Sequence, residues 1–473
     1  DGVFDIDIDM SKNVPDATDA NINVEGGTFS KGVDLAYVAD GQKVGVKPGG
    51  GMEVGSEISG EGFDVIYTVS GDENASMSAI VYTADMFKKA LDNDSVTEIT
   101  LGKDFGGSYT IDRDVTIKAA NGVTFSGNIV IESSSVTRTT GPNVKLEGVA
   151  FQGNGSGTAI SVKNGSLTMT GGSITDYDNG IVAGTRGGAA VDISVDNVEF
   201  TELDEKGIYG EAFGDLTVKN STFNGAGNDA SGAGNPYTGR SAAAIDINQT
   251  VAGGSVSITG NTFIDCGDNG STSGAIKIKV RNIPVEQSYG QAGDFAAEHN
   301  ELVGSFEAVS VTNNTFTNCS RDIVVGTGYV AKTYVDMTQS GNESYESDGT
   351  TTRDLIFVDN AHVDDAESLM NAFADEDLVL IEVFANITTT DIIVVDKPGK
   401  SVVLDLNGYT ITANDTTTST TESGVSIGAG FLYLADGTLT VKDGTVNAIE
   451  DSFRVQTEAT DDYAKLILAD DLT

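Results

Sequence analysis

One twelve-residue phrase occurs twice in this chain of 473 residues and restricts the folds that it can adopt. Residues 255–266 read SVSITGNTFIDC, and residues 308–319 read AVSVTNNTFTNC. In the first copy, Val256 and Ile258 stand seven and five places before Phe263, and the second copy repeats that frame before Phe316. Such recurrence predicts a repeat architecture in which each repeat offers the same side chains to its neighbours.

The same frame fits four earlier segments, and its last positions are spaced by 23, 26, 23, 40 and 53 residues along the chain. Alternation places the two apolar side chains on one face of a strand, and the Thr-Gly-Asn or Thr-Asn-Asn that follows favours a turn. A second short strand begins at the phenylalanine, and a third carries an isoleucine. The earlier segments are VKLEGVAF (144–151), LTMTGGSI (167–174), ISVDNVEF (193–200) and LTVKNSTF (216–223), and the isoleucines are Ile160, Ile181, Ile208, Ile245, Ile276 and Ile323.

Three short strands and three turns in roughly 23 residues make one coil of a parallel β-helix. A composition of 58 glycines and only 6 prolines suits many short strands joined by tight turns. We therefore expect an all-β fold, a right-handed parallel β-helix solenoid. Over roughly residues 80–330 the sequence resembles the right-handed β-helix of the pectate-lyase-like superfamily, whose coils commonly carry Asn-x-Phe turns.

The two cysteines obey the same repeat. Cys266 and Cys319 each stand three residues after the phenylalanine of their phrase. Like residues of stacked coils lie ~5 Å apart, which is compatible with a disulfide and equally with two stacked buried thiols.

Two segments break the strand pattern with helical spacing. Residues 83–102 begin with apolar side chains at Met86, Phe87, Ala90 and Leu91, and residues 364–387 repeat the plan with Leu369, Met370 and Phe373. Each is followed by a strand, so we expect short amphipathic helices that cap the start of a β-helical module.

These caps divide the chain into three expected parts. Residues 1–76 would be the final coil and exit of a preceding module, and GGTFSKGVDLAYVADGQKVGV (26–46) resembles a segment that closes β-helical modules in large repetitive surface proteins of bacteria. Residues 77–358 would be a capped β-helix with insertions near 225–243 and 281–306, and residues 359–473 the cap and first coils of another. We expect the chain to be a slice through a longer array.

The net charge of the chain limits the classes of molecule that it can bind. The formal net charge of −44 makes nucleic acid and anionic membranes poor partners and favours cations. Calcium is the cation that carboxylate-rich surfaces often hold. ITDYDNG (174–180) is a candidate calcium turn through Asp176 and Asp178, but it lacks the full EF-hand spacing, which favours a polar turn without metal.

The two insertions are the candidate binding surface, because insertions on solenoids commonly contact ligands. Their side chains suited to stacking on a sugar or hydrogen bonding with it are Tyr237, Arg240, Tyr289 and Gln291.

A catalytic set is carried by KIKVR (277–281), where Lys277, Lys279 and Arg281 alternate with Ile278 and Val280 and so face outward. Polysaccharide lyases of the resembling superfamily use calcium-bound carboxylates with an Arg or Lys base, which implies a lyase role for these three residues with Asp265 and Asp322. A basic stripe that balances neighbouring carboxylates is the alternative.

The sequence thus leaves three functions open. The main interpretation is a structural or adhesive segment of an extracellular microbial surface protein, forming a stiff stalk, filament or layer and contacting a glycan or protein partner or further copies of itself. In that case the chain is not an enzyme. The alternatives are a β-helical polysaccharide lyase or glycoside hydrolase, and a phage tail spike or fibre.

Overall fold

The computed structural model describes most of the chain in two compact units. The described residues are 3–4, 24–30, 33, 35–69, 77–133, 141–227, 243–267, 274–280, 282–284, 301–327, 337–363, 365–374, 380–383, 385–390, 392–414, 419–420, 426–427, 430–448, 451–455, 464–469 and 472. The first unit comprises residues 1–184, 191–204 and 216–225, and the second comprises 185–190, 205–215 and 226–473. Among the described residues, no helix is long and apolar enough to cross a membrane.

The first unit opens with short, mainly antiparallel strands. Strand β2 pairs antiparallel with β4, β4 and β5 flank β3, and β5 pairs antiparallel with β6. Their apolar side chains, among them Val24, Phe29 and Val44, make a small core of their own. The elements are β1 (Val3–Phe4), β2 (Gly27–Phe29), a 3-10 helix (Leu35–Tyr37), β3 (Lys43–Val46), β4 (Met52–Gly55), β5 (Val65–Thr68) and β6 (Met77–Val81).

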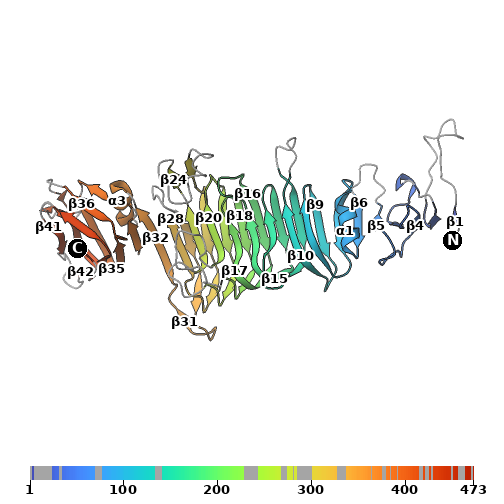
Figure 1. The fold of residues 1–473 in the computed structure, drawn as a ribbon. Coiled ribbons are helices and arrows are strands. Elements are labelled where there is room, and N and C mark those ends of the chain that lie inside the picture. Colours follow the sequence, from blue (N-terminus) through green and yellow to red (C-terminus); the bar gives the residue numbers. More distant parts are fainter. Residues whose placement is uncertain are drawn as a thin grey trace. The chain divides into compact units, whose positions relative to one another are not determined.

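From β6 onward the strands of the first unit pair in parallel, coil upon coil (Figure 1). Val144 pairs with Leu167, and Leu167 with Ile193, as the repeat frame predicts. The elements are β7 (Val96–Leu101), β8 (Phe105–Ile111), β9 (Val115–Ala119), β10 (Thr124–Ile131), β11 (Asn143–Glu147), β12 (Ala150–Gln152), β13 (Thr158–Val162), β14 (Ser166–Thr170), β15 (Ser173–Ala183), β16 (Val191–Asp196), β17 (Glu199–Gly210), β18 (Phe213–Lys219) and β19 (Thr222–Asn224), of which β17 and β18 are shared with the second unit.

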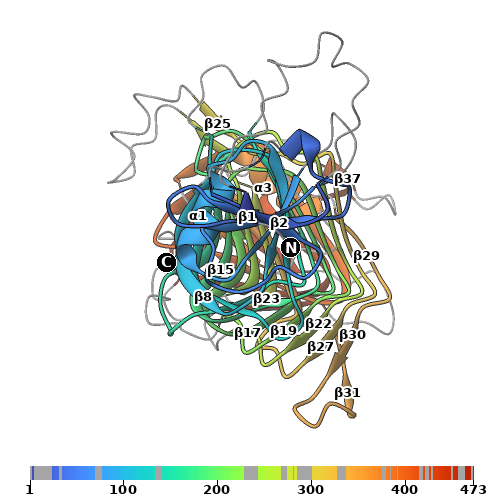
Figure 2. The same cartoon turned by 90° about the vertical axis from the view of Figure 1, so that its right-hand side faces the viewer.

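Helix α1 (Ala84–Leu91) confirms the first predicted cap. Thr83 begins it by accepting a hydrogen bond from the Met86 amide at 3.3 Å, and Met86, Phe87 and Ala90 are buried. The helix contacts β5 to β8, and Figure 2 shows it lying across the coil that contains β8. At its other end, the Arg113 guanidinium donates to the carbonyls of Ala90 and Leu91 at 3.0 and 2.9 Å.

The second unit continues the parallel pairing. Both copies of the opening phrase lie in it, and Val256 pairs with Val309, Ile258 with Val311 and Phe263 with Phe316. The two phenylalanine rings stack with centroids 5.1 Å apart. The elements are β20 (Ala243–Gln249), β21 (Ser255–Thr259), β22 (Thr262–Ile264), β23 (Gly274–Val280), β24 (Asn282–Pro284), β25 (Glu301–Val303), β26 (Ala308–Thr312), β27 (Thr315–Thr317), β28 (Ile323–Thr327), β29 (Met337–Ser340), β30 (Glu343–Tyr345) and β31 (Thr352–Arg353).

A ladder of asparagines fixes the turns of these coils. The Asn314 side chain is fully buried; its Oδ1 accepts from the amide nitrogen and the Nδ2 of Asn261, both at 3.0 Å. Its Nδ2 donates to the Ile258 carbonyl at 3.0 Å and to Asn342 Oδ1 at 3.1 Å. The second residue before each phenylalanine position is therefore asparagine in these coils because its amide satisfies the buried backbone of the neighbouring coil.

The last part of the second unit has a separate apolar core that includes helix α3 (Ala366–Ala374). The helix was predicted, but Met370 is 36% exposed, and the buried residues are Leu369, Ala372 and Phe373. Strand β28 pairs with β32, β32 with β33, and β33 with β35, all in parallel. The elements are β32 (Phe357–Val363), β33 (Leu380–Val383), β34 (Ile387–Thr389), β35 (Ile393–Asp405), β36 (Thr410–Ala413), β37 (Ser419–Thr420), β38 (Ser426–Ile427), β39 (Gly430–Lys442), β40 (Thr445–Ala448), β41 (Asp451–Val455) and β42 (Lys465–Leu468).

Candidate functional site

A column of polar side chains runs along the outer face of one sheet in the second unit. Ile208 of β17 pairs with Ile245 of β20, and Ile245 pairs with Ile276 of β23. These isoleucines point into the core, so the residues that follow them point outward. Tyr209, Asp246 and Lys277 are those residues, and the register places them side by side on three successive coils.

This outward column is nevertheless largely buried. The exposed fraction is 2% for Lys277, 3% for Asp246 and 6% for Lys206, which lies at the same sheet and holds its Nζ 4.6 Å from the centre of the Tyr209 ring. Tyr209 and Lys279 are half-buried. We call Lys206, Tyr209, Asp246, Lys277 and Lys279 the lysine cluster. Gathering three lysine amines where water is scarce costs stability, which makes the cluster a functional candidate.

A second outward column borders the cluster. Asn248 pairs with Lys279, and the Asn248 Nδ2 donates to Glu211 Oε1 at 3.4 Å. The Glu211 carboxylate also forms an ion pair with Arg186 at 2.9 Å. This carboxylate is therefore occupied by Arg186 and Asn248.

Electrostatics set the protonation of Lys277. Burial lowers the pKa of its amine well below the usual value, and the neighbouring charges of Lys279 and Lys206 lower it further. The carboxylate of Asp246 acts in the opposite direction but does not cancel these effects. The lysine cluster thus holds an amine that loses its proton readily beside ammonium groups that can bind an anion.

The sequence-based catalytic set is only partly brought together. Lys277 and Lys279 lie in the cluster as predicted, and Arg281 lies outside the described residues. The predicted partners Asp265 and Asp322 have other roles. Asp265 is exposed at a turn, where it accepts from the Asn318 side chain at 2.5 Å.

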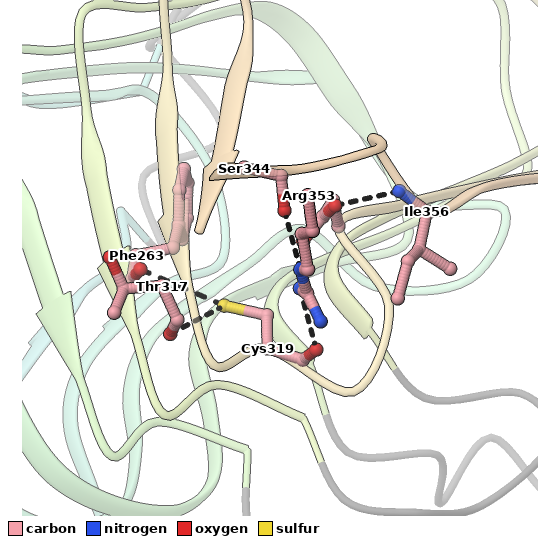
Figure 3. A network of polar contacts seen from close by, with 7 residues as sticks. Phe263, Thr317, Cys319, Ser344, Arg353 and Ile356 are labelled. Carbon is pink, nitrogen blue, oxygen red and sulfur yellow. Dashed lines mark hydrogen bonds and ion pairs between the residues drawn. The ribbon is translucent and has the colours of Figure 1, made fainter. Parts of the chain in front are cut away.

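Asp322 belongs to a buried structural network, and Figure 3 labels its partners Arg353 and Ile356. Its Oδ1 forms an ion pair with Arg353 at 2.9 Å, and its Oδ2 accepts from the Ile356 amide at 2.7 Å. Arg353 also donates to the Cys319 carbonyl at 3.0 Å and to Ser344 Oγ at 2.7 Å. Burial raises the pKa of Asp322, with the hydrogen bond from Ile356 and the charge of Arg353 opposing that rise. The network therefore ties the hairpin of β30 and β31 to the coil before it.

The two remaining predicted sites are a binding surface and a calcium turn. Tyr237, Arg240, Tyr289 and Gln291 lie outside the described residues. Asp176 and Asp178 lie in β15 of the first unit; Asp178 accepts from the Gly157 amide at 2.7 Å and Asp176 from the Gln152 side chain at 3.4 Å. No group of three or more metal-ligating side chains gathers in the described parts of the chain.

Both cysteines are buried free thiols in this structure. Cys266 donates to the Ile264 carbonyl at 3.3 Å, and Cys319 lies 3.6 Å from the Thr317 carbonyl (Figure 3). Burial raises the pKa of the Cys266 thiol well above its usual value, and the adjacent Cys319 adds to that rise. Of the two arrangements that the sequence allowed, the structure contains the stacked thiols.

Sequence reasoning missed Lys206, Tyr209, Asp246 and the Arg186–Glu211 pair. The isoleucine ladder already contained the signal for two of them, because the residues that follow Ile208 and Ile245 must lie beside Lys277. Arg186 and Lys206 carried no such signal: Arg186 lies between β15 and β16, and Lys206 lies two residues before Ile208, away from the position that follows it.

Comparison with known proteins adds little beyond these observations. No protein-family model matches the chain, and no curated protein matches it. Among solved structures, an alginate lyase from Paenibacillus sp. str. FPU-7 is similar at 14% identity with a TM-score of 0.28, covering 81% of this chain and 99% of that one. A mutant of the PL6-family alginate lyase AlyGC is similar at 8% identity and a TM-score of 0.19, covering 83% and 75%. Scores this low carry no argument about function, and the all-β, parallel-coil fold rests on the strand pairing described above.

Proposed function

We propose that the chain is a polysaccharide lyase that cleaves a uronate-containing polymer at the lysine cluster. The observation that carries the proposal is the placement of Lys277 and Asp246 side by side on adjacent coils, next to Lys279 and Lys206, in a chain whose net charge is −44. A structural coil has no need for three clustered lysine side chains. An anionic sugar supplies the negative charge that this cluster attracts.

The chemistry follows from the residues present. The ammonium of Lys279 neutralises the sugar carboxylate, which acidifies the C5–H bond, and the neutral amine of Lys277 accepts that proton. The C5–H electrons form the C4=C5 double bond as the C4–O bond breaks. The departing oxygen takes a proton from the Tyr209 hydroxyl, and solvent returns the proton from Lys277 to Tyr209, so the enzyme is regenerated.

Access to the cluster is from the side of Lys279 and Tyr209, whose side chains are half-buried. Lys277 is 2% exposed, so the reaction requires a rotation that brings its Nζ to that side. A hydrolase at the same place is less well supported, since hydrolysis needs two cooperating carboxyl groups and Glu211 is already paired with Arg186.

The test is the ultraviolet absorbance of the unsaturated product during incubation with alginate and with polygalacturonate, with and without calcium. We expect Lys277→Met to lower the rate by 2 orders of magnitude or more, on the scale of a general base. Lys163→Met is the matched control, because Lys163 makes an exposed ion pair with Glu132 in the first unit. Absence of product from every polyuronate, or full activity in Lys277→Met, would refute the proposal.

One observation also favours the stalk or adhesive function of an extracellular surface protein. In the second unit, parallel pairing continues from β23 through β28 and β32 to β35, so one run of strands leads from the stacked coils into the apolar core of the last part. Electron microscopy of the purified chain, with light scattering, would detect filaments or layers, and particles that stay monomeric at all concentrations would count against self-assembly.

A further inference from the structure

The first unit contains a polar pocket that the proposed reaction does not use. Its volume is about 500 Å³, and it is lined by residues of three successive coils between Ser126 and Tyr177. Asn128 and Thr158 are half-buried in its wall, and Gln152, Asn154 and Ser156 are exposed at its rim. The size suits a small organic ligand.

Two glycines of the lining allow neighbouring coils to approach closely. A Cβ atom on Gly127 would lie 2.0 Å from the Gly107 carbonyl oxygen, and one on Gly153 would lie 2.0 Å from the Asp176 carbonyl oxygen. No side chain can therefore grow from these two positions without displacing the neighbouring coil. The lining at both positions is therefore bare backbone.

The Tyr177 side chain fixes the wall. It is 5% exposed, and its hydroxyl donates to the Gly127 carbonyl at 2.6 Å, two coils away. The bond uses the hydroxyl and holds the mostly buried ring in the lining, where it exposes only a small apolar part to the pocket. Amides and hydroxyls beside a small apolar patch suit a saccharide, because a sugar ring has apolar C–H faces and polar edges.

The chemistry of the lining excludes charged ligands. The lining residues include no lysine, arginine or histidine, and Asp176 and Asp178 lie next to it, so an anion would be repelled. A cation lacks ligands, because no three metal-ligating side chains gather in the described residues. Asn128 and Thr158 make no side-chain hydrogen bond within the described part of the chain, so their polar groups are available to hydroxyl groups.

We propose that this pocket binds a neutral saccharide unit, held by Asn128, Thr158 and the rim amides. The site would anchor the protein to a neutral glycan independently of the lysine cluster, which lies in the other unit. Its existence does not depend on lyase activity, and each proposal can fail alone.

The experiment is titration calorimetry of the whole chain with cellohexaose, maltohexaose, mannohexaose and, as the charged comparison, hexagalacturonate. We expect at least one neutral oligosaccharide to bind, and Asn128→Leu and Gln152→Ala each to weaken that binding tenfold or more. Asn121→Ala is the matched control, an exposed amide at a turn away from the pocket, and should change binding less than twofold.

Three results would overturn the proposal: no binding of any neutral oligosaccharide, tighter binding of hexagalacturonate than of every neutral one, or unchanged binding in Asn128→Leu. Circular dichroism of each variant establishes that it is folded. If Asn128→Leu does not fold, Gln152→Ala alone decides, because Gln152 is exposed and its truncation leaves the coil intact.

Discussion

Replacing Asn314 by alanine tests whether the asparagine ladder holds neighbouring coils together. The substitution removes four hydrogen bonds of a fully buried side chain, two to Asn261, one to the Ile258 carbonyl and one to Asn342. At about 1 kcal/mol of net stabilisation for each, the loss is about 4 kcal/mol. The substitution also leaves the buried partners of Asn314 without a hydrogen bond, which adds to the cost, so about 4 kcal/mol is a low value for the destabilisation.

Hydrogen exchange measured by mass spectrometry is the suitable assay, because a solenoid opens coil by coil and a single unfolding free energy is poorly defined. A loss of about 4 kcal/mol corresponds to a fall in protection of about a thousandfold for the amides of β21 and β26. Thr312→Ala is the matched control, since it removes a single half-buried bond to Thr259 between the same two coils. We expect it to lower protection by about tenfold or less.

The reasoning would be refuted if Asn314→Ala lowered protection no more than Thr312→Ala does. That result would mean that the apolar columns alone hold the coils together and that water replaces the lost amide. A fall confined to residues 313–315 would also contradict it, because the bonds reach the preceding coil at Asn261 and Ile258.

Three further predictions follow from the buried polar groups. Burial raises the pKa of Asp322, so its carboxyl group stays protonated to a higher pH in the folded state than in the unfolded state. The protonated carboxyl therefore contributes its full stabilisation below the usual pKa of 3.8, and this stabilisation is lost as the pH rises through the raised pKa of the folded state. The difference in urea midpoint between the native protein and Asp322→Asn should therefore change across that window, and a constant difference would contradict this. Arg113→Ala should destabilise the end of α1 by about 2 kcal/mol, seen as faster exchange of residues 88–92, whereas Lys88→Ala, which removes an exposed pair with Asp92, should have little effect. Cys266 should resist alkylation by iodoacetamide in the native state and react in denaturant without reductant, and failure to react in denaturant would reveal a disulfide.

The repeat predicted from sequence proved to be the register of the sheets. Phe263 pairs with Phe316 and Val256 with Val309 because a side chain of a stacked coil meets only the like position of the next coil. Helices α1 and α3 were predicted from their apolar spacing, although Met370 of α3 is 36% exposed. A sequence pattern predicts contacts correctly where the repeat determines which residue lies next to each position.

The candidate site was harder to predict because its residues are not among the apolar positions that define the repeat. Lys277 was identified, but its partner is Asp246, and not the predicted Asp322, whose carboxylate is held by Arg353. Periodicity predicts that a side chain points outward; it does not predict whether other residues cover it. The burial of Lys277, which gives its amine a low pKa, therefore became visible only in the structure.

The parallel pairing of β20, β23 and β28 has a mechanical consequence. The hydrogen bonds between these strands run along the direction in which the coils stack, so a force pulling in that direction loads one coil boundary after another. Each boundary that yields frees the chain between like positions, about 30 residues from Ile245 to Ile276, or about 100 Å of extended polypeptide in place of ~5 Å of stacked coil. Under tension this part of the protein would lengthen in steps, and each step would dissipate part of the mechanical work done on it.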